Sequence, residues 1–302
     1  MLNFRLLKVR ICQMKPSLLQ VEIAPDHSFA VRPHVNPLFY NQWHYHPELE
    51  LTWVQQGSGI RFVGDSIENF QAGDLILLGP NLPHFWRSDE RPGEGGPLPC
   101  QALVVQFGQH FWGEAFLALP ELAAIRDLLV KARRGIRLTG HTREQVSILM
   151  QELALATGLN RILGLLRILQ LIAAGDRTYL SSVGFNQPLN AADTKRIAII
   201  YAYTLSHFSG KIKLEEAAAL VHMTPNAFCR YFKRHTRKTY SQFLTEIRIG
   251  HACKLLMEDF GSIAQVCLES GFQNFSNFNR YFKAITQLTP YQYTKLHRKT
   301  PA

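Results

Sequence analysis

The sequence lacks a long uninterrupted apolar run, a leader-like start and any paired cysteine motif. Its strongest apolar stretch, residues 162–174, is interrupted by Arg167 and is too short to cross a bilayer. Residues 1–15 carry charges inside their apolar run and offer no small-residue cleavage site, unlike a secretory signal. The 5 cysteines are scattered without a CxxC pair. We therefore expect reduced thiols in a cytoplasmic protein that neither spans a membrane nor depends on disulfides.

Charged residues are also modest in number, but they are unevenly placed. They make up 19% of the 302 residues and hydrophobic residues make up 46%, which excludes wholesale disorder or a rod and predicts about two domains. Residues 190–302 hold 16 Lys and Arg against 7 Asp and Glu, whereas residues 1–189 hold 17 against 16. A basic segment joined to a nearly neutral one favours a nucleic-acid binder with a sensory or assembly domain. A basic face that meets only solvent is the alternative.

Residues 14–106 have the pattern of short strands separated by turns. Glycine- and proline-containing turns recur roughly every 8–12 residues, which is typical of a sandwich or a small barrel. The strand-like runs between these turns are residues 49–54, 60–63, 75–78 and 102–107. Residues 14–19 look like a natural start. Residues 1–13 are therefore interpreted as an N-terminal extension, and the start codon is either Met1 or Met14.

The pattern changes to helical spacing in the middle of the chain. Residues 121–174 repeat apolar side chains at helical intervals, which predicts two or three helices ending near Gly175. Because the apolar positions lie on more than one face, one face can pack on the strands and the other can bind a second subunit. A helix hairpin buried within one monomer explains the pattern as well. We assign a helical assembly segment to residues 107–185, a linker to residues 186–192 and a helical domain to residues 193–300.

The basic segment contains an internal repeat. The hexapeptide at residues 228–233, FCRYFK, recurs fifty residues later as FNRYFK at residues 278–283. Each copy follows a short apolar helix and a tight turn, so the segment predicts two helix-turn-helix units. Pro225 suits the first turn of one second helix, and Asn274 is a candidate N-cap of the other.

The second helix of each unit is predicted to have a buried face and a basic outer face. The two phenylalanines of each copy are four residues apart and share a face that packs on the first helix. At about 100° per residue, the arginine between them points away. Arginine and asparagine pair well with base edges, whereas lysine suits phosphates. An ordinary bundle with solvated arginines is the alternative, but a duplicated basic face argues against it. The candidate DNA-binding residues are Asn226, Arg230, Lys233, Ser276, Asn277, Arg280 and Lys283.

The second copy carries a longer motif that resembles a known family. Residues 271–283 read GFxxxSxFxRxFK and are followed by a Thr-Pro pair, closely similar to the signature of AraC/XylS transcription regulators. The resemblance covers residues 193–300. Two positions depart from the signature, since Gln287 replaces the usual glycine and Thr294 replaces the final basic residue. Both follow the second recognition helix, so they affect its C-terminal turn more than DNA reading.

This resemblance implies a geometry and a set of partners. In AraC/XylS regulators the two helix-turn-helix units are joined by one long helix, here residues 240–257, and both recognition helices enter successive major grooves. The resemblance further implies control of transcription, more often activation, with double-stranded DNA and RNA polymerase as partners. Helices placed like those of residues 107–185 pair two chains in this family, so we expect a homodimer.

The neutral segment contains a cluster of histidines and glutamates. His44, His46 and Glu50 are placed at positions i, i+2 and i+6, which share one face of a strand, and His84 can arrive from a second strand. Imidazoles combined with one carboxylate suit Fe, Mn, Ni, Cu or Zn. Glu48 has the same parity as His46 and Glu50 and is a further candidate to face a ligand. The predicted ligand pocket comprises these five residues, and the predicted metal ligands are all of them except Glu48.

The spacing HxHxxxE…H resembles the metal-binding motifs of the cupin barrel, and regulators similar to this chain carry such a domain before the DNA-binding module. Three interpretations of the cluster stay open: a divalent transition metal, a metal-free polar pocket for a small molecule such as a sugar, or histidines satisfied by hydrogen bonds without a ligand. The predicted fold is α+β: a cupin-like β-barrel at residues 14–106, a helical dimerisation segment, and a C-terminal all-α double helix-turn-helix domain.

The predicted function is a sequence-specific DNA-binding transcription regulator, an activator, controlled by a small-molecule effector, with carbohydrates as the candidate class. The alternative is a metal-dependent cupin enzyme, of the dioxygenase or isomerase type, fused to a DNA-binding domain. No acid–base pair or nucleophile stands apart from the cluster in the sequence, and a third of the chain is committed to DNA. We therefore predict no catalytic residues and no enzymatic activity.

Overall fold

The computed structural model describes most of the chain, which divides into two compact units between residues 188 and 189. The described residues are 17–36, 44–89, 99–110, 112–182, 191–258 and 260–297. The expected extension at residues 1–13 lies outside them. So does the expected linker at residues 186–192, apart from its last two residues, which begin a helix. The first unit, which comprises residues 16–188, contains both β-sheets, and the second unit, from residue 189 onwards, is helical where it is described.

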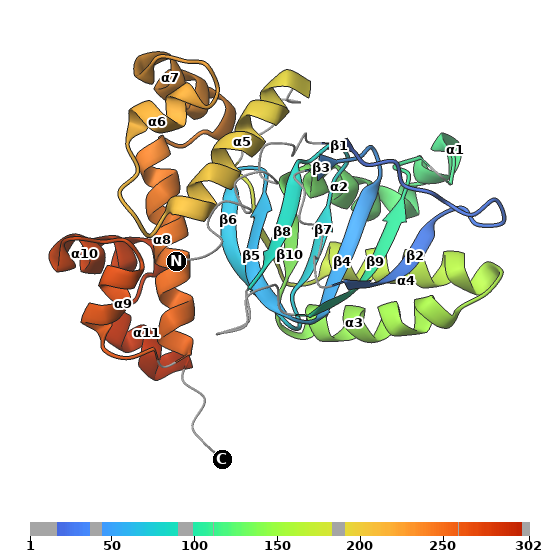
Figure 1. Ribbon diagram of the computed structural model, residues 1–302. Coiled ribbons are helices and arrows are strands. Elements are labelled where there is room, and N and C mark those ends of the chain that lie inside the picture. Colours follow the sequence, from blue (N-terminus) through green and yellow to red (C-terminus); the bar gives the residue numbers. More distant parts are fainter. Residues whose placement is uncertain are drawn as a thin grey trace. The chain divides into compact units, whose positions relative to one another are not determined.

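Two sheets form the framework of the first unit (Figure 1). The five-stranded sheet has the order β1 (Ser17–Leu18), β3 (His44–Tyr45), β8 (His84–Ser88), β5 (Ser58–Val63), β6 (Ser66–Gln71). The six-stranded sheet has the order β11 (Arg177–Tyr179), β10 (Ile136–Leu138), β7 (Leu75–Leu78), β4 (Leu49–Gln56), β9 (Cys100–Phe107), β2 (Ala30–Asn36). Neighbouring strands are antiparallel except β1 and β3, which are parallel. The predicted N-terminal β-structure is therefore confirmed.

Successive residues of the central strands face opposite layers, because side chains alternate along a strand. In β4, Leu49 and Leu51 belong to a core shared with helices, whereas Val54 belongs to a second core between the two sheets. Trp86 of the five-stranded sheet lies in that second core. Glu50 has the parity of Val54, so its carboxylate points into the space between the sheets.

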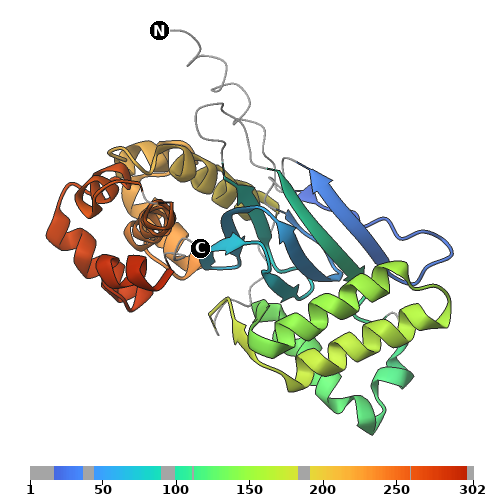
Figure 2. The same ribbon diagram turned by 90° about the horizontal axis from the view of Figure 1, so that it is seen from below.

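Helices cover the other face of the six-stranded sheet. They are α1 (Glu114–Leu117), α2 (Ala123–Lys131), α3 (Gly140–Leu155) and α4 (Leu159–Ala174), with short 3-10 turns η2 (Pro120–Leu122) and η3 (Ala132–Arg134). Figure 2 shows α3 and α4 side by side along the sheet. The prediction of two or three helices ending near Gly175 is confirmed by α2, α3 and α4.

Two strands in this region were not expected. The strands β10 and β11 flank α3 and α4 in sequence, and β10 extends the six-stranded sheet by pairing with β7. Each has three residues, too few for a periodic pattern to stand out. The sequence separated residues 14–106 from residues 107–185, whereas the structure joins these segments through a common sheet and a common core. They form one compact unit.

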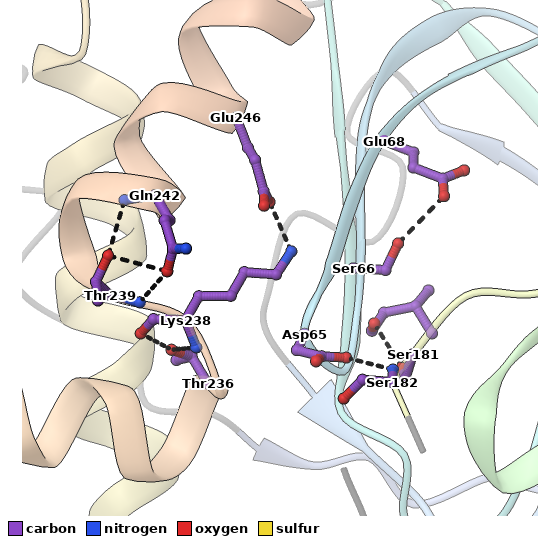
Figure 3. A network of polar contacts seen from close by, with 11 residues as sticks. Asp65, Ser66, Glu68, Ser181, Ser182, Thr236, Lys238, Thr239, Gln242 and Glu246 are labelled. Carbon is purple, nitrogen blue, oxygen red and sulfur yellow. Dashed lines mark hydrogen bonds and ion pairs between the residues drawn. The ribbon is translucent and has the colours of Figure 1, made fainter. Parts of the chain in front are cut away.

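The end of the first unit is held by specific hydrogen bonds (Figure 3). The hydroxyl of Ser181 donates to the carbonyl of Val63 at the end of β5, at 2.9 Å. The backbone N–H of Ser182 donates to Oδ1 of Asp65 in the β5–β6 turn, also at 2.9 Å. These bonds fix the point from which the chain leaves the sandwich.

The second unit is made of seven helices over its described residues (Figure 1). They are α5 (Ala191–His207), α6 (Leu214–Ala219), α7 (Pro225–Thr236), α8 (Tyr240–Met257), α9 (Ile263–Glu269), α10 (Phe275–Thr286) and α11 (Pro290–His297). The predicted double helix-turn-helix is confirmed, with α6–α7 and α9–α10 as the two units. The long helix expected at residues 240–257 is α8, with those bounds.

Side-chain caps explain where the helices of the second unit begin. Thr224 accepts a hydrogen bond from the third residue of α7, and Asn274 accepts one from Asn277 at 2.8 Å in α10. The N-cap predicted for Asn274 is confirmed. Thr239 and Gln242 form a reciprocal capping box at the start of α8, which Figure 3 shows with both hydrogen bonds. Among the described residues, no helix is both long enough and apolar enough to cross a membrane.

Candidate functional site

Two places in the molecule have the chemistry of a functional site, one in each unit. The first is the outer face of α7 and α10. The four phenylalanines of the repeat are completely buried, as predicted, and the opposite side of each helix faces solvent. All seven candidate DNA-binding residues are exposed: Asn226, Arg230, Lys233, Ser276, Asn277, Arg280 and Lys283. Their contact with DNA stays a prediction.

The outer face of α10 is organised by contacts among its own residues. Nη2 of Arg280 donates to Oδ1 of Asn277 at 3.2 Å, and the guanidinium lies 4.8 Å from the centre of the Tyr281 ring. Tyr281 is 37% exposed. An arginine and an asparagine side by side offer donors and acceptors that can read guanine and adenine edges.

The corresponding tyrosine of α7 has different surroundings. The hydroxyl of Tyr231 donates to the backbone carbonyl of Asp193 in α5 at 3.1 Å. Burial, together with the charge of Asp193, raises the pKa of Tyr231. Nε2 of His235 lies 3.8 Å from Oδ2 of Asp193. The helix α5 thus covers one flank of α7.

The second site is the group of histidines and glutamate between the sheets. His44 lies in β3 and pairs with His84 of β8 in the five-stranded sheet, while Glu50 lies in β4 of the six-stranded sheet. His46 follows β3. Their side chains are 0–2% exposed, and one ligand atom from each of the four lies within 4.8 Å of the others. The predicted convergence is confirmed.

The route to this convergence differs from the prediction. His44, His46 and Glu50 were expected on a single strand, but the chain turns at Pro47 and Glu48 and passes from one sheet to the other. Proline has no N–H for a strand ladder, so a continuous strand through Pro47 is disfavoured. The four side chains therefore approach from two facing sheets.

Glu50 is bound by several donors inside the cluster. Its Oε1 accepts from Oγ1 of Thr52 at 2.7 Å, and its Oε2 accepts from Nε2 of Gln106 at 2.8 Å. Nε2 of His46 lies 3.0 Å from Oε2. The sequence reasoning missed Thr52 and Gln106. Thr52 shares the strand parity of Glu50, whereas Gln106 faces Glu50 through the pairing of β4 with β9, which only the register reveals.

The histidine rings are oriented by backbone carbonyls. Nδ1 of His46 lies 3.1 Å from the carbonyl of Glu48, and Nδ1 of His84 lies 2.7 Å from the carbonyl of Leu82. Because a carbonyl only accepts, each Nδ1 carries hydrogen and each Nε2 is turned towards Glu50. Nε2 of His84 makes no hydrogen bond and lies 3.9 Å from Oε1 of Glu50. This ring orientation is the usual preparation of a metal-binding histidine.

The charges within the cluster depend on burial and on one another. Burial opposes ionisation of Glu50, but the hydrogen bond from His46 and the three imidazoles outweigh it and hold the pKa of Glu50 well below its usual range. Burial and the neighbouring His44 lower the pKa of His84, which is therefore neutral with a free lone pair on Nε2. Burial also disfavours charged His46, yet the hydrogen bond and charge of Glu50 raise its pKa.

The donor set fits a transition metal. Three imidazoles and one carboxylate are ligands that Fe, Mn, Ni, Cu and Zn accept. Ligand atoms bound to one cation at about 2.1 Å lie at most about 4.2 Å apart, so the four donor atoms, which lie within 4.8 Å of one another, need only small shifts to bind one ion. The bare Nε2 of His84 and the ionised carboxylate of Glu50 both favour a cation at this point, and Nε2 of His46 would release its proton to bind it. Glu48 lies apart from this group, because its Oε2 is 3.6 Å from Nδ1 of His46, on the other side of the ring.

Comparisons with known proteins match a part of each unit. The AraC-like ligand binding domain family matches residues 26–107, and the helix-turn-helix domain family matches residues 217–296. The chain belongs to the AraC-type regulators. The first match covers the strands around the buried cluster, and the second covers both recognition helices of this AraC-type regulator.

Individual relatives match only a part of it. The HTH-type transcriptional regulator YobQ of Bacillus subtilis is 30% identical over 99 residues, which are 33% of this chain and 39% of the relative. The melibiose operon regulatory protein of Escherichia coli is 25% identical over 103 residues, 34% of each chain. The match therefore spans well under half of these relatives. An AraC-type regulator structure from Chromobacterium violaceum covers 37% of this chain and 100% of its own, with 20% identity and a TM-score of 0.34, too low to carry an argument.

Proposed function

We propose that this AraC-type protein is a sequence-specific DNA-binding transcription regulator whose effector binds in the first unit. The observation that carries the proposal is the duplicated helix-turn-helix, in which each recognition helix buries the same phenylalanine pair and exposes an arginine at the same place. Arginine, asparagine and serine would read base edges, and Lys233 and Lys283 would bind phosphates. The excess of cations in residues 190–302, 16 against 7 anions, would attract the DNA.

The test is selection of bound sequences from a random duplex library, followed by footprinting of the enriched site. We expect a site that spans two successive major grooves, with an affinity that falls steeply as salt rises. The control variant Arg143→Ala removes a cation whose side chain is 42% exposed on α3 in the first unit, and it should bind the site like the wild type. Failure to enrich any sequence, or binding that ignores salt, would contradict the proposal.

We further propose that His44, His46, Glu50 and His84 hold a divalent transition metal. Such a metal would supply a positive charge in the buried core to which an oxygen-bearing effector can bind. The chain itself keeps both Nδ1 atoms engaged with carbonyls and keeps Glu50 ionised, so that the donor atoms are ready.

Metal analysis of protein purified without chelators tests this site. About one equivalent of a transition metal is expected in the wild type and in His141→Ala, whose ring is exposed on α3, and none in His84→Ala. Circular dichroism shows whether each variant is folded. Absence of metal from folded wild type would favour the metal-free polar pocket, with Glu48 among its candidates.

A carbohydrate is the first effector class to test. One matched relative is named for the melibiose operon, and hydrogen-bonding groups such as Thr52 and Gln106 suit sugar hydroxyls. A panel of sugars read by thermal shift, with and without metal, is the direct experiment. A raised melting temperature with one class of sugar is the expected result.

The proposal extends to assembly and to RNA polymerase. The helices of the first unit expose Ile148, Leu155, Leu159 and Leu163, and a groove of about 700 Å³ lies between α2 and α4. We propose that this apolar surface pairs two copies of the chain, which sedimentation of wild type and Leu163→Glu would test. We propose that the chain acts in the cytoplasm as an activator together with RNA polymerase. Transcription from a promoter by purified protein and RNA polymerase, measured with and without effector, would test the activator role.

The relatives are named as transcription regulators, which favours a regulator over a metal-dependent dioxygenase or isomerase.

A further inference from the structure

The two helix-turn-helix units of the second unit share the helix α8. Near its start, Tyr240 and Phe243 pack on Phe232 of α7, and Phe243 stacks on Tyr201 of α5. Its C-terminal half, from Ile249 onwards, lies in the core with α9 and α10. Each half of the unit is thus attached to a different end of one helix. If the two recognition helices are to keep a fixed orientation relative to each other, a contact between the two halves must prevent their rotation about α8.

Arg248 occupies the junction between these two ends of α8. Its Nε donates to the carbonyl of Phe208 and its Nη2 donates to the carbonyl of Gly210, each at 2.8 Å. Phe208 directly follows α5 and Gly210 lies two residues further on, so the guanidinium binds the chain where it leaves the negative end of that helix. The same guanidinium lies 5.8 Å from the centre of the Phe272 ring, which belongs to the core of the second half. One side chain therefore contacts both halves.

Gly271 lets the halves come this close. A Cβ at this position would lie 2.6 Å from the carbonyl oxygen of Phe208 and 2.9 Å from Nε of Arg248. The backbone of Gly271 also has φ +81°, which side chains other than glycine rarely adopt. The turn between α9 and α10 is thus pressed against the end of α5, with Arg248 between them.

We infer that Arg248, with Gly271, is a positioning residue that sets the orientation of the two recognition helices and so the spacing of the two half-sites that the protein accepts. The inference rests on the proposed DNA-binding function. Successive major grooves face the same side of DNA about every 10–10.5 base pairs, so a fixed orientation rejects a site with one inserted base pair. Arg248 does this through two carbonyls and a ring of the protein itself.

The orientation can be measured without DNA. Cys229 is exposed on α7, whereas Cys100, Cys253 and Cys267 are buried, so spin labels can be placed at Cys229 and at Ala284→Cys in a Cys12→Ser background. Mixing the labelled protein with an excess of unlabelled protein suppresses the signal from pairs of labels on different chains. We expect a narrow distance distribution in the wild type and a broader or displaced one in Arg248→Met.

Two further variants keep the test decisive. Arg248→Lys retains the charge but loses the planar fork that reaches two carbonyls, so an intermediate width is expected. Gly271→Ala should broaden the distribution although Arg248 is intact. Lys254→Met is the control on the same helix, because Lys254 pairs with Glu258 of the following turn at 3.8 Å. It should leave the distribution unchanged.

The DNA measurement uses the selected site and a copy with one base pair inserted between its half-sites. Wild type and Lys254→Met should bind the inserted site roughly 10–100-fold more weakly, since contacts of one half are lost. For Arg248→Met the ratio should fall to about threefold or less, because the halves can adjust. The inference would be overturned if folded Arg248→Met and Gly271→Ala had the label distances of the wild type and the same ratio of affinities for the selected and the inserted site. If the wild type selects no DNA, the proposed function fails, and the label distances alone decide the role of Arg248.

Discussion

The two halves of the helix-turn-helix unit start from nearly the same hexapeptide and end in different surroundings. Both recognition helices bury two phenylalanines completely and expose an arginine between them. The tyrosine that follows this arginine differs: Tyr231 is bonded to the backbone of Asp193 in α5, whereas Tyr281 is 37% exposed beside Arg280. The first half has a helix on its flank, and the second half keeps that flank open.

This difference shows that the repeat determines the helix and its buried face, whereas the neighbouring helices determine whether the remaining side chains are buried or exposed. The spacing of four residues forces both phenylalanines of each copy onto one face in any helix. No such rule applies to the tyrosine, which lies at the edge of that face. Tyr231 is therefore part of the packing against α5, whereas Tyr281 is open to solvent.

The largest effect should come from the buried pairs, where the halves are alike. Phe232→Ala and Phe282→Ala should each lower the free energy of unfolding of the second unit by about 3–5 kcal/mol, because each leaves a cavity in an aromatic core. All 4 tryptophans lie in the first unit, so loss of helical ellipticity without a change in tryptophan fluorescence reports the second unit. Phe275→Ala, at a 48% exposed position of α10, is the control. If Phe282→Ala lowered the free energy of unfolding no more than Phe275→Ala does, the second half would not depend on its buried phenylalanines as the first half does.

Removal of the arginines should have the next largest effect. Arg230→Ala and Arg280→Ala should each weaken binding to the selected DNA site by about 1–3 kcal/mol, as the loss of a good base contact does. Titration of labelled DNA measures both. Lys233→Ala should instead reduce the slope of affinity against salt by about 1 without changing the preferred sequence. If one of the two arginine variants bound the selected DNA site with unchanged affinity, only the arginine of the other half would contact bases.

The tyrosines should separate the halves directly. Tyr231→Phe removes a half-buried hydroxyl bonded to Asp193 and should lower the free energy of unfolding by about 1 kcal/mol. Tyr281→Phe should change it by less than about 0.5 kcal/mol, since that side chain is exposed. Thermal unfolding of the paired variants measures the difference. Equal losses would mean that the flank of α10 is covered in solution.

The smallest effect concerns the ends of the recognition helices, where both halves place a residue other than glycine in the left-handed region. Gln287 has φ +62° and Arg237 has φ +59°. Gln287→Gly should therefore raise the free energy of unfolding by about 0.5–1 kcal/mol, because glycine adopts this conformation without strain. Gln287→Ala keeps the Cβ and should give no gain. Chemical denaturation distinguishes the two, and a gain with alanine would rule out backbone strain as the cause.

The buried cluster shows how far sequence reasoning reaches into a site. Residue types and spacing were enough to bring together His44, His46, Glu50 and His84, because few patterns place so many imidazoles near one carboxylate. The path between them was wrong, since Pro47 and Glu48 carry the chain from one sheet to the other. Gln106 was missed because its place opposite Glu50 depends on the register of two strands about fifty residues apart.

By itself, the sequence determined the local structure of the protein. The repeat, its caps and its phenylalanine spacing determine two helix-turn-helix units, and the apolar period determines the helices near residues 121–174. The tertiary structure alone decided which distant groups meet: the joining of β10 to the main sheet, the bonds of Tyr231 to α5, and the contact of Arg248 with both halves. The physical reason is range. Capping and periodicity act within a few residues, whereas register and packing depend on segments that only folding brings into contact.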